Sequence, residues 1–395
     1  AEAVRSKSTP ALFFGVTNVD GEIYMHQAGT KWVDNPSSGF IDEDTVFWVC
    51  SQTKLITTIA ALQLLEQGKI ALDTPVEQIL PELANPVIVT GTDDDGNLLT
   101  TPAKFKITFG QLLNHTSGLD YFVDGTLPPS LLPLSYSHNY KGEDVSVFFK
   151  MLKGTLPGVP LKFEPGTNFA YGFSSDCAGF IVERLSGKSL EQYFQEFIFA
   201  PLGITSTSFY LTPALKERLL PLSNRNADGT IETLNQHSYI EQDPANVTVN
   251  FGGVGLYSSQ KDYLTILRHL LQIKSGRATN QILTLASVNK MFEPTVPPAG
   301  GVAVNAVAAL LSKYLGLPAG TAQFSRGLLF NTEDVPGKRR KGSGTWGGWA
   351  NTSFFVDPTT GVAAVFATQL TPASDDKYEQ LFSVLEKELY SGLKA

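Results

Sequence analysis

The chain has few cysteines and a deficit of positive charge. Its 395 residues include two cysteines, Cys50 and Cys177, and the formal net charge at pH 7 is −8. Two cysteines are too few for a disulfide scaffold and do not resemble a metal site, so we expect both to be core thiols. The negative charge argues against nucleic acid, or an anionic membrane surface, as an electrostatic partner.

Long hydrophobic runs are also missing. No stretch reaches the ~20 apolar residues of a membrane helix, and residues 1–7 contain no hydrophobic signal core. We therefore expect a soluble, cytoplasmic protein with no membrane partner, although a leader removed before residue 1 would leave secretion open. The basic run at 338–341 is interpreted as a solvated loop, with a localisation signal or an anion patch as alternatives.

Two common hydrolase signatures do not occur in the sequence. Neither the nucleophile elbow G-x-S-x-G nor the zinc motif H-E-x-x-H is found. The pattern G-x-G-x-x-G does occur at 342–347, but a basic loop precedes it and a predicted strand follows it. A dinucleotide site needs a strand before and a helix after this pattern, so we reject that interpretation.

The sequence is hydrophobic enough, at 42%, to build a large core. Strand-like segments joined by turns, at Asp20-Gly21 and at 357–361, predict hairpins near both ends, and helical periodicity predicts helices between them and at the C-terminus. The hairpins are expected at 11–28 and 352–367, and the helices at 51–65, 176–197 with a break at 186–187, 261–273 and 373–389.

This order predicts an α/β (α+β) fold in which one antiparallel sheet is closed by the two termini. We expect residues 1–64 and 250–395 to form the sheet domain and residues 65–249 to form an inserted, mostly helical domain. Residues 121–161, rich in proline, glycine and aromatic side chains, are read as a loop. It is either a substrate lid or an ordinary surface insertion anchored by its aromatic rings.

The most informative feature is the pair Ser51 and Lys54, which lie one helical turn apart at the start of an apolar run. A serine hydroxyl needs a base to become a nucleophile, and an amine three residues later lies on the same helix face. Partial dehydration favours a neutral amine, which can take the serine proton. The pair is the Ser-x-x-Lys arrangement of an acyl-enzyme hydrolase.

The same spacing recurs elsewhere in the chain, so the motif alone is weak. Of these copies, Ser258 and Lys261 also begin an amphipathic stretch, but Asp262 follows directly and would keep that lysine charged. The alternative for Ser51 is that it merely caps a core helix.

A Ser/Lys pair also needs a proton relay and an oxyanion hole. Tyr171 follows a Pro-Gly turn and precedes a predicted helix, which suits a relay, although a core aromatic beside a turn would look the same. Gly347 and Gly348 precede a predicted strand. They would let the backbone approach a bound ester, so that one N–H there and the N–H of Ser51 meet its carbonyl oxygen.

Taken together, these motifs resemble the serine β-lactamase and penicillin-binding superfamily in order and approximate spacing. The resemblance covers roughly residues 10 to 390 and is greatest to the class C branch, its esterase relatives, and fungal acyltransferases and esterases of statin-type polyketides. For the superfamily it rests on Ser51-Gln-Thr-Lys54, Leu112-Leu-Asn-His115-Thr-Ser-Gly118, Tyr171, Ala200-Pro-Leu-Gly-Ile204, Gly252-Gly253 and Trp346-Gly347-Gly348. For the fungal enzymes it rests on Asp93-Asp-Asp-Gly-Asn97, Val182-Glu-Arg184 with Leu190-Glu-Gln-Tyr193, Arg339-Arg-Lys-Gly342 and Ala367-Thr-Gln-Leu370.

The resemblance implies a role for each matching residue. Ser51 is expected to be the nucleophile, and Lys54 and Tyr171 to share the general-base and general-acid work. By position, the backbone N–H groups of Ser51 and Trp349 would form the oxyanion hole. His115 is expected to be structural.

Two departures from the β-lactamase pattern bear on the substrate. Phe173 stands where an asparagine would bind an acylamino side chain, and Trp346 stands where a lysine would pair with a substrate carboxylate. An unpaired carboxylate would be costly to desolvate in such a pocket. We expect neutral or apolar substrates that contact Trp346, Gly347, Gly348, Phe173 and Tyr121.

The leading hypothesis is a serine carboxylesterase or acyltransferase of this superfamily. It would cleave or transfer the acyl group of a neutral, hydrophobic, polyketide-like ester or thioester through an acyl-enzyme on Ser51. The alternatives are a β-lactamase or DD-peptidase, and a non-catalytic binding protein with the same fold. No metal or organic cofactor and no nucleic-acid partner is implied, and the sequence does not fix the oligomeric state.

Overall fold

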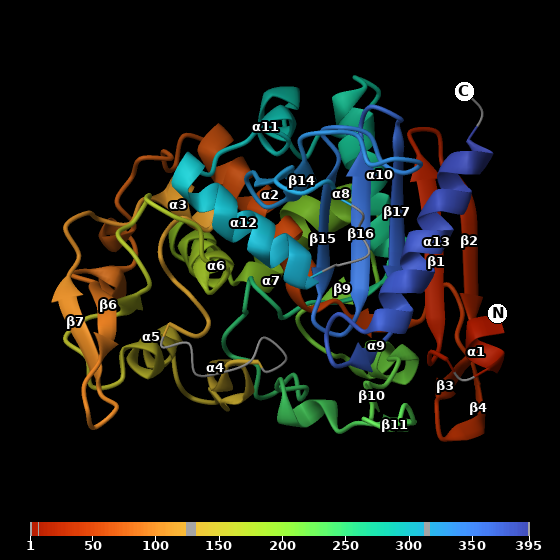
Figure 1. Cartoon of the computed structure of the whole chain (residues 1–395), viewed down its shortest axis with the longest axis horizontal. Helices are drawn as coiled ribbons and strands as arrows, with labels where there is room; N and C mark the ends of the chain where they lie inside the picture. The colour runs from red at the N-terminus through yellow and green to blue at the C-terminus, as the bar shows by residue number, and fades with distance from the viewer. Residues whose placement is uncertain (1, 7, 124–131, 312–316, 394–395) are drawn as a thin grey trace.

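A seven-stranded antiparallel sheet forms one side of the molecule (Figure 1). The computed structural model describes residues 2–6, 8–123, 132–311 and 317–393. The strand order is β13 (Ala322–Phe324), β14 (Leu329–Asn331), β15 (Gly344–Gly348), β16 (Thr352–Asp357), β17 (Val362–Ala367), β1 (Leu12–Asn18) and β2 (Glu22–Ala28). Strand β1 pairs with β17, so the two ends of the chain meet within one sheet, as predicted.

Strand alternation sends the residues of β1 to opposite faces of this sheet. Phe14 lies on the face covered by helix α13 (Asp376–Gly392), with Phe366 stacked 4.7 Å from Tyr378. Phe13 belongs to the main core on the other face, where helix α10 (Gln260–Lys274) packs on β1 and β17. The sheet is therefore covered by helices on both faces (Figure 1).

The helices beside the sheet surround α2 (Thr53–Glu66), which packs against α6 (Ser174–Ser186). Most of α2 is buried on every side, as its apolar sequence requires. Helix α6 ends at Gly187, whose φ of 69° only glycine adopts easily, and α7 (Leu190–Phe194) follows behind a capping box on Ser189. The predicted break at 186–187 is confirmed.

The remaining helices and strands complete the chain. The helices are α1 (Glu2–Arg5), α3 (Phe109–Leu113), α4 (Leu134–Ser137), α5 (Val145–Lys153), α8 (Ala200–Leu202), α9 (Pro213–Arg218), α11 (Leu285–Lys290) and α12 (Pro298–Leu311). The strands are β3 (Thr30–Trp32), β4 (Asn35–Phe40), β5 (Val46–Trp48), β6 (Val87–Thr92), β7 (Leu98–Pro102), β8 (Pro160–Leu161), β9 (Thr207–Ser208), β10 (Ser223–Arg225), β11 (Ile231–Thr233), β12 (Tyr257–Ser259) and β18 (Leu370–Thr371).

The segment 121–161 is more ordered than the predicted loop. Residues 124–131 lie outside the described residues, but α4 and α5 are helices within the rest. Asp144 caps α5 by accepting a hydrogen bond from Ser146 N–H, and Phe148 and Phe149 are buried. The prolines and glycines stand outside this helix, so counting them across the whole segment concealed it.

The basic run 338–341 is half buried, which corrects its interpretation as a solvated loop. Lys338 and Arg339 are 4% and 0% exposed, whereas Arg340 and Lys341 are exposed. The Arg339 guanidinium donates through Nε and Nη2 to the two carboxylate oxygens of Glu386 on α13, at 2.8 and 2.9 Å. That partner is 47 residues away in the sequence, where no local pattern indicates it.

Both cysteines lie in the core, as predicted. Cys50 and Cys177 are free and buried, and burial raises the pKa of the Cys50 thiol to about 12 and that of Cys177 well above its ordinary value. They stay protonated and unreactive at neutral pH. Across the described part of the chain, every helix is too short or too polar to cross a bilayer.

Candidate active site

Ser51 sits in a tight turn between β5 and α2. One turn of 3-10 helix, η1 (Cys50–Gln52), precedes α2, and Cys50 takes a φ of 48° that a non-glycine residue rarely adopts. Gln52 is the N-cap of α2, and no side chain caps the helix. The Ser51 hydroxyl instead meets Lys54, so the alternative of a simple capping serine is wrong.

The Lys54 amine is the centre of the site. It is 2% exposed, and its Nζ lies 3.1 Å from Ser51 Oγ, 3.0 Å from the Tyr121 hydroxyl and 2.7 Å from the Gly253 carbonyl oxygen. A neutral amine has two N–H donors and one lone pair. In the structure Nζ donates toward all three oxygens. In its neutral form, with the two N–H donors given to Gly253 and Tyr121, the lone pair would face Ser51, which is the arrangement a general base needs.

The second Ser-x-x-Lys copy shows no such pairing. Ser258 is buried with its hydroxyl 2.7 Å from the hydroxyl of Thr207, and the Lys261 amine forms an exposed ion pair with Glu43. The apolar residues after Lys54, in contrast to the Asp262 that follows Lys261, were the sequence feature that distinguished the two copies.

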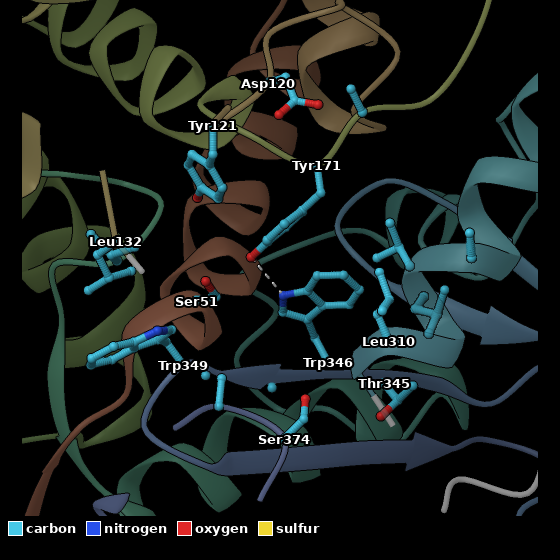
Figure 2. A pocket seen from close by; sticks show the side chains of 18 of the residues that line it. Ser51, Asp120, Tyr121, Leu132, Tyr171, Leu310, Thr345, Trp346, Trp349 and Ser374 are labelled. Atoms are coloured by element: carbon cyan, nitrogen blue, oxygen red, sulfur yellow. Dashed lines mark hydrogen bonds between the residues drawn. The ribbon is translucent and has the colours of Figure 1, made fainter. Parts of the chain in front are cut away.

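Tyr171 lies across the cavity from Ser51, and its hydroxyl points toward the serine (Figure 2). The hydroxyl accepts a hydrogen bond of 3.2 Å from Trp346 Nε1, and Lys54 Nζ lies 4.7 Å from the centre of the Tyr171 ring. The structure therefore brings together the three residues predicted to be catalytic. Trp346 reaches the site from β15 and orients the tyrosine.

Strand β15 passes close to the serine turn, and its glycines make this possible. A Cβ atom added at Gly348 would lie 2.5 Å from the Val49 carbonyl oxygen, and one at Gly347 would lie 2.7 Å from the Thr352 carbonyl oxygen. The glycines are thus needed for packing within the protein, a reason that the sequence did not reveal. Trp349, which follows, lines the cavity together with Ser51.

The two aromatic residues expected to contact substrate differ in placement. Tyr121 lines the cavity and accepts a hydrogen bond from Lys54, so it belongs to the amine's own environment. Phe173 is 3% exposed, with its ring 4.8 Å from that of Tyr121, and is not among the described residues that line the cavity. Phe173 packs against the Tyr121 ring and does not line the cavity, where it was expected to contact substrate.

His115 is a packing residue, as expected. Its ring is buried 5.1 Å from that of Tyr171, and burial, with Lys54 nearby, holds the pKa of the imidazole well below its ordinary value. A neutral histidine at a φ of 58° shapes the turn behind Tyr171.

Sequence reasoning missed Tyr136 and Asp176. Asp176 is fully buried; one carboxylate oxygen accepts from the Gly253 N–H and the other from the Tyr136 hydroxyl, each at 2.8 Å. Burial raises the pKa of Asp176 to about 6, against the opposing effects of Lys54, Tyr136 and the Gly253 N–H. A carboxylate directly before the apolar run 177–182 was the signal that could have found it.

The cavity above Ser51 has a volume of about 620 Å³. Helix α12 supplies an apolar wall with Ala303, Val307 and Leu310, while Asp120 and Lys162 form an ion pair of 2.8 Å at another edge. Within the described residues, no group of three or more His, Cys, Asp or Glu side chains is placed to hold a metal ion.

The chain is similar in sequence and architecture to named acyltransferases and esterases. A monacolin J acid methylbutanoyltransferase of Aspergillus terreus is 32% identical over 99% of this chain and 94% of its own, and a lovastatin esterase of Penicillium rubens is 33% identical over 88% and 85%. A simvastatin synthase structure from Aspergillus terreus superposes with a TM-score of 0.83 at 32% identity, covering 100% of this chain and 96% of that one.

These similarities confirm the predicted fold class and superfamily. The family model described as Beta-lactamase matches residues 1–386, nearly the whole chain. With the Ser51, Lys54 and Tyr171 constellation in place, the chain belongs to the Beta-lactamase family, on its acyltransferase and esterase side.

Proposed function

We propose that the protein is a serine esterase or acyltransferase that acts on neutral, hydrophobic esters or thioesters through an acyl-enzyme on Ser51. The observation that carries this proposal is the setting of the Lys54 amine. Its Nζ is within hydrogen-bond distance of Ser51 Oγ, the Gly253 carbonyl oxygen and the Tyr121 hydroxyl, so a neutral amine can donate to Gly253 and Tyr121 and accept the serine proton.

In the first step, Ser51 Oγ forms a bond to the carbonyl carbon of the ester while its proton passes to Lys54 Nζ. The carbonyl oxygen becomes an oxyanion, which the backbone N–H groups of Ser51 and Trp349 would stabilise. The bond to the leaving alcohol or thiol then breaks, and Tyr171 or Lys54 returns a proton to that group. Water or an acceptor alcohol reverses these steps on the acyl-enzyme.

The lining of the cavity supports a neutral substrate. Trp346 takes the place where a lysine would pair with a carboxylate, and Lys162 is already paired with Asp120. The apolar wall of α12 suits a hydrocarbon group. Relatives named for methylbutanoyl transfer to monacolin J acid and for lovastatin ester hydrolysis support a polyketide-like ester of secondary metabolism as the substrate.

The test is to follow acyl transfer from p-nitrophenyl esters and acyl thioesters of short and medium length. Release of the leaving group is measured with water alone and with an added hydrophobic alcohol, and the products are separated as free acid and new ester. A new ester formed in preference to acid indicates an acyltransferase, and acid alone indicates an esterase.

Ser51→Ala should lower the rate by at least about 10³-fold, because it removes the nucleophile. Ser391→Ala is the matched control, since Ser391 is an exposed serine of another Ser-x-x-Lys copy and should behave as wild type. A folded Ser51→Ala protein with wild-type turnover would refute the proposal.

A further inference from the structure

A chain of buried polar groups runs from Asp176 to the Lys54 amine by two routes. One route passes through the hydroxyls of Tyr136 and Tyr121, which are 3.2 Å apart. The other passes through Gly253, whose N–H donates to Asp176 and whose carbonyl oxygen accepts from Lys54. Asp176 and Tyr136 are 0% and 1% exposed, and neither is among the described residues that line the cavity.

The charge of Asp176 gives the hydroxyl route a direction. A carboxylate only accepts hydrogen bonds, so Tyr136 donates its single proton to it. The Tyr136 and Tyr121 hydroxyls are 3.2 Å apart, and because the single Tyr136 proton is given to Asp176, Tyr121 must be the donor between them; the Tyr121 oxygen accepts from Lys54. Burial is the main reason that the pKa values of both tyrosines lie well above their ordinary value, so both stay protonated and each has one proton to donate.

Reversing this direction would disable the base. If Asp176 donated to Tyr136, then Tyr136 would donate to Tyr121 and Tyr121 would donate to the amine. A donor aimed at Lys54 would occupy the lone pair that must face Ser51.

We propose that Asp176 is a positioning residue: through Tyr136, Tyr121 and Gly253 it holds the Lys54 amine with its lone pair toward Ser51. This inference rests on the proposed acyl-enzyme function. It also predicts that activity depends on the ionisation of Asp176, because a protonated carboxyl donates to Tyr136 and reverses the chain.

The pH at which this happens follows from the surroundings of Asp176. Burial raises its pKa to about 6, so kcat should fall as the pH drops through about 6. The titratable groups that interact with the carboxyl come from several elements. They are Lys54 on α2, Tyr136 on α4, Tyr121 and Tyr140 on the intervening segments, and Cys177 on α6.

Asp176→Asn tests the proposal while keeping both hydrogen-bond partners of the carboxylate, Gly253 and Tyr136. The amide oxygen can accept from Gly253 N–H while the amide NH2 donates to Tyr136, which is the reversed direction. The matched control is Tyr140→Phe, which also removes a buried hydroxyl close to Asp176. The Tyr140 hydroxyl donates to the Ser135 carbonyl oxygen, outside the chain to Lys54.

The experiment measures kcat and KM of the full-length protein with a p-nitrophenyl ester between pH 5 and 9, with unfolding midpoints recorded alongside. Asp176→Asn and Tyr136→Phe should each lower kcat by about 10²-fold with little change in KM, as for loss of a proton-transfer group. The fall of kcat near pH 6 should be absent from Asp176→Asn. Tyr140→Phe should match wild type.

Two outcomes would overturn the inference while leaving the function intact. In one, Asp176→Asn keeps wild-type kcat and the same fall near pH 6. In the other, Asp176→Asn loses activity but kcat still falls near pH 6, and Tyr136→Phe is as active as Tyr140→Phe. That result would make Asp176 merely structural. A wild-type protein that shows no turnover with any donor would instead refute the proposed function, and this inference with it.

Discussion

Ionisation of Asp176 should destabilise the folded protein, and the size of this effect follows from its burial. Its pKa is raised from the ordinary 3.8 to about 6. One pKa unit is 1.36 kcal/mol, so the folded state loses about 3 kcal/mol in total as the pH rises through this window. The sign is fixed because the folded protein binds this proton more tightly than the unfolded chain does. Stability from this group is highest below pH 3.8, falls up to about pH 6, and is constant above.

The assay is urea unfolding of wild type and Asp176→Asn at a series of pH values from 4 to 8. The difference in unfolding free energy between the two proteins removes contributions from all groups that they share. Between pH 4 and 8 the unfolding free energy of wild type should fall by about 2 to 3 kcal/mol relative to that of the variant, and most of this fall should occur below pH 7. It is smaller than the total because part of the change takes place below pH 4. A difference that stays constant with pH would show that Asp176 titrates normally, and would refute the reasoning about its burial.

Two further substitutions test the packing that supports the site. Gly348→Ala should lower kcat by about 10²- to 10³-fold, the effect of losing one oxyanion donor. The new Cβ would lie 2.5 Å from the Val49 carbonyl oxygen and push β15 away from the serine turn. The control Gly301→Ala, whose new Cβ would meet only a side chain 3.8 Å away, should be active, and a Gly348→Ala protein that is equally active would contradict this account. Glu386→Gln should lower the unfolding free energy by about 3 to 5 kcal/mol, because it removes the carboxylate that is hydrogen-bonded to the buried Arg339. An unchanged urea midpoint would show that the pair contributes nothing.

Elements set by local sequence were predictable. The hairpin of β1 and β2 follows from the turn at Asp20 and Gly21 between two strand-like segments, and the end of α6 follows from Gly187. The pair Ser51 and Lys54 was predictable for the same reason, since three residues along a helix place two side chains on one face.

Features that depend on distant partners were not predictable. Arg339 reads as part of a charged loop until Glu386 of α13 is placed beside it. Asp176 lies five residues after Tyr171, but its link to Lys54 passes through Tyr136, which comes from a different helix. Such contacts are fixed by tertiary packing, which a single sequence does not reveal.

The most direct test of the central claim is intact-mass spectrometry of the protein mixed with a p-nitrophenyl ester, followed by peptide mapping. The account predicts one acyl group per chain, located on Ser51, in wild type and none in Ser51→Ala. An adduct on another residue, or equal labelling of the two proteins, would contradict it.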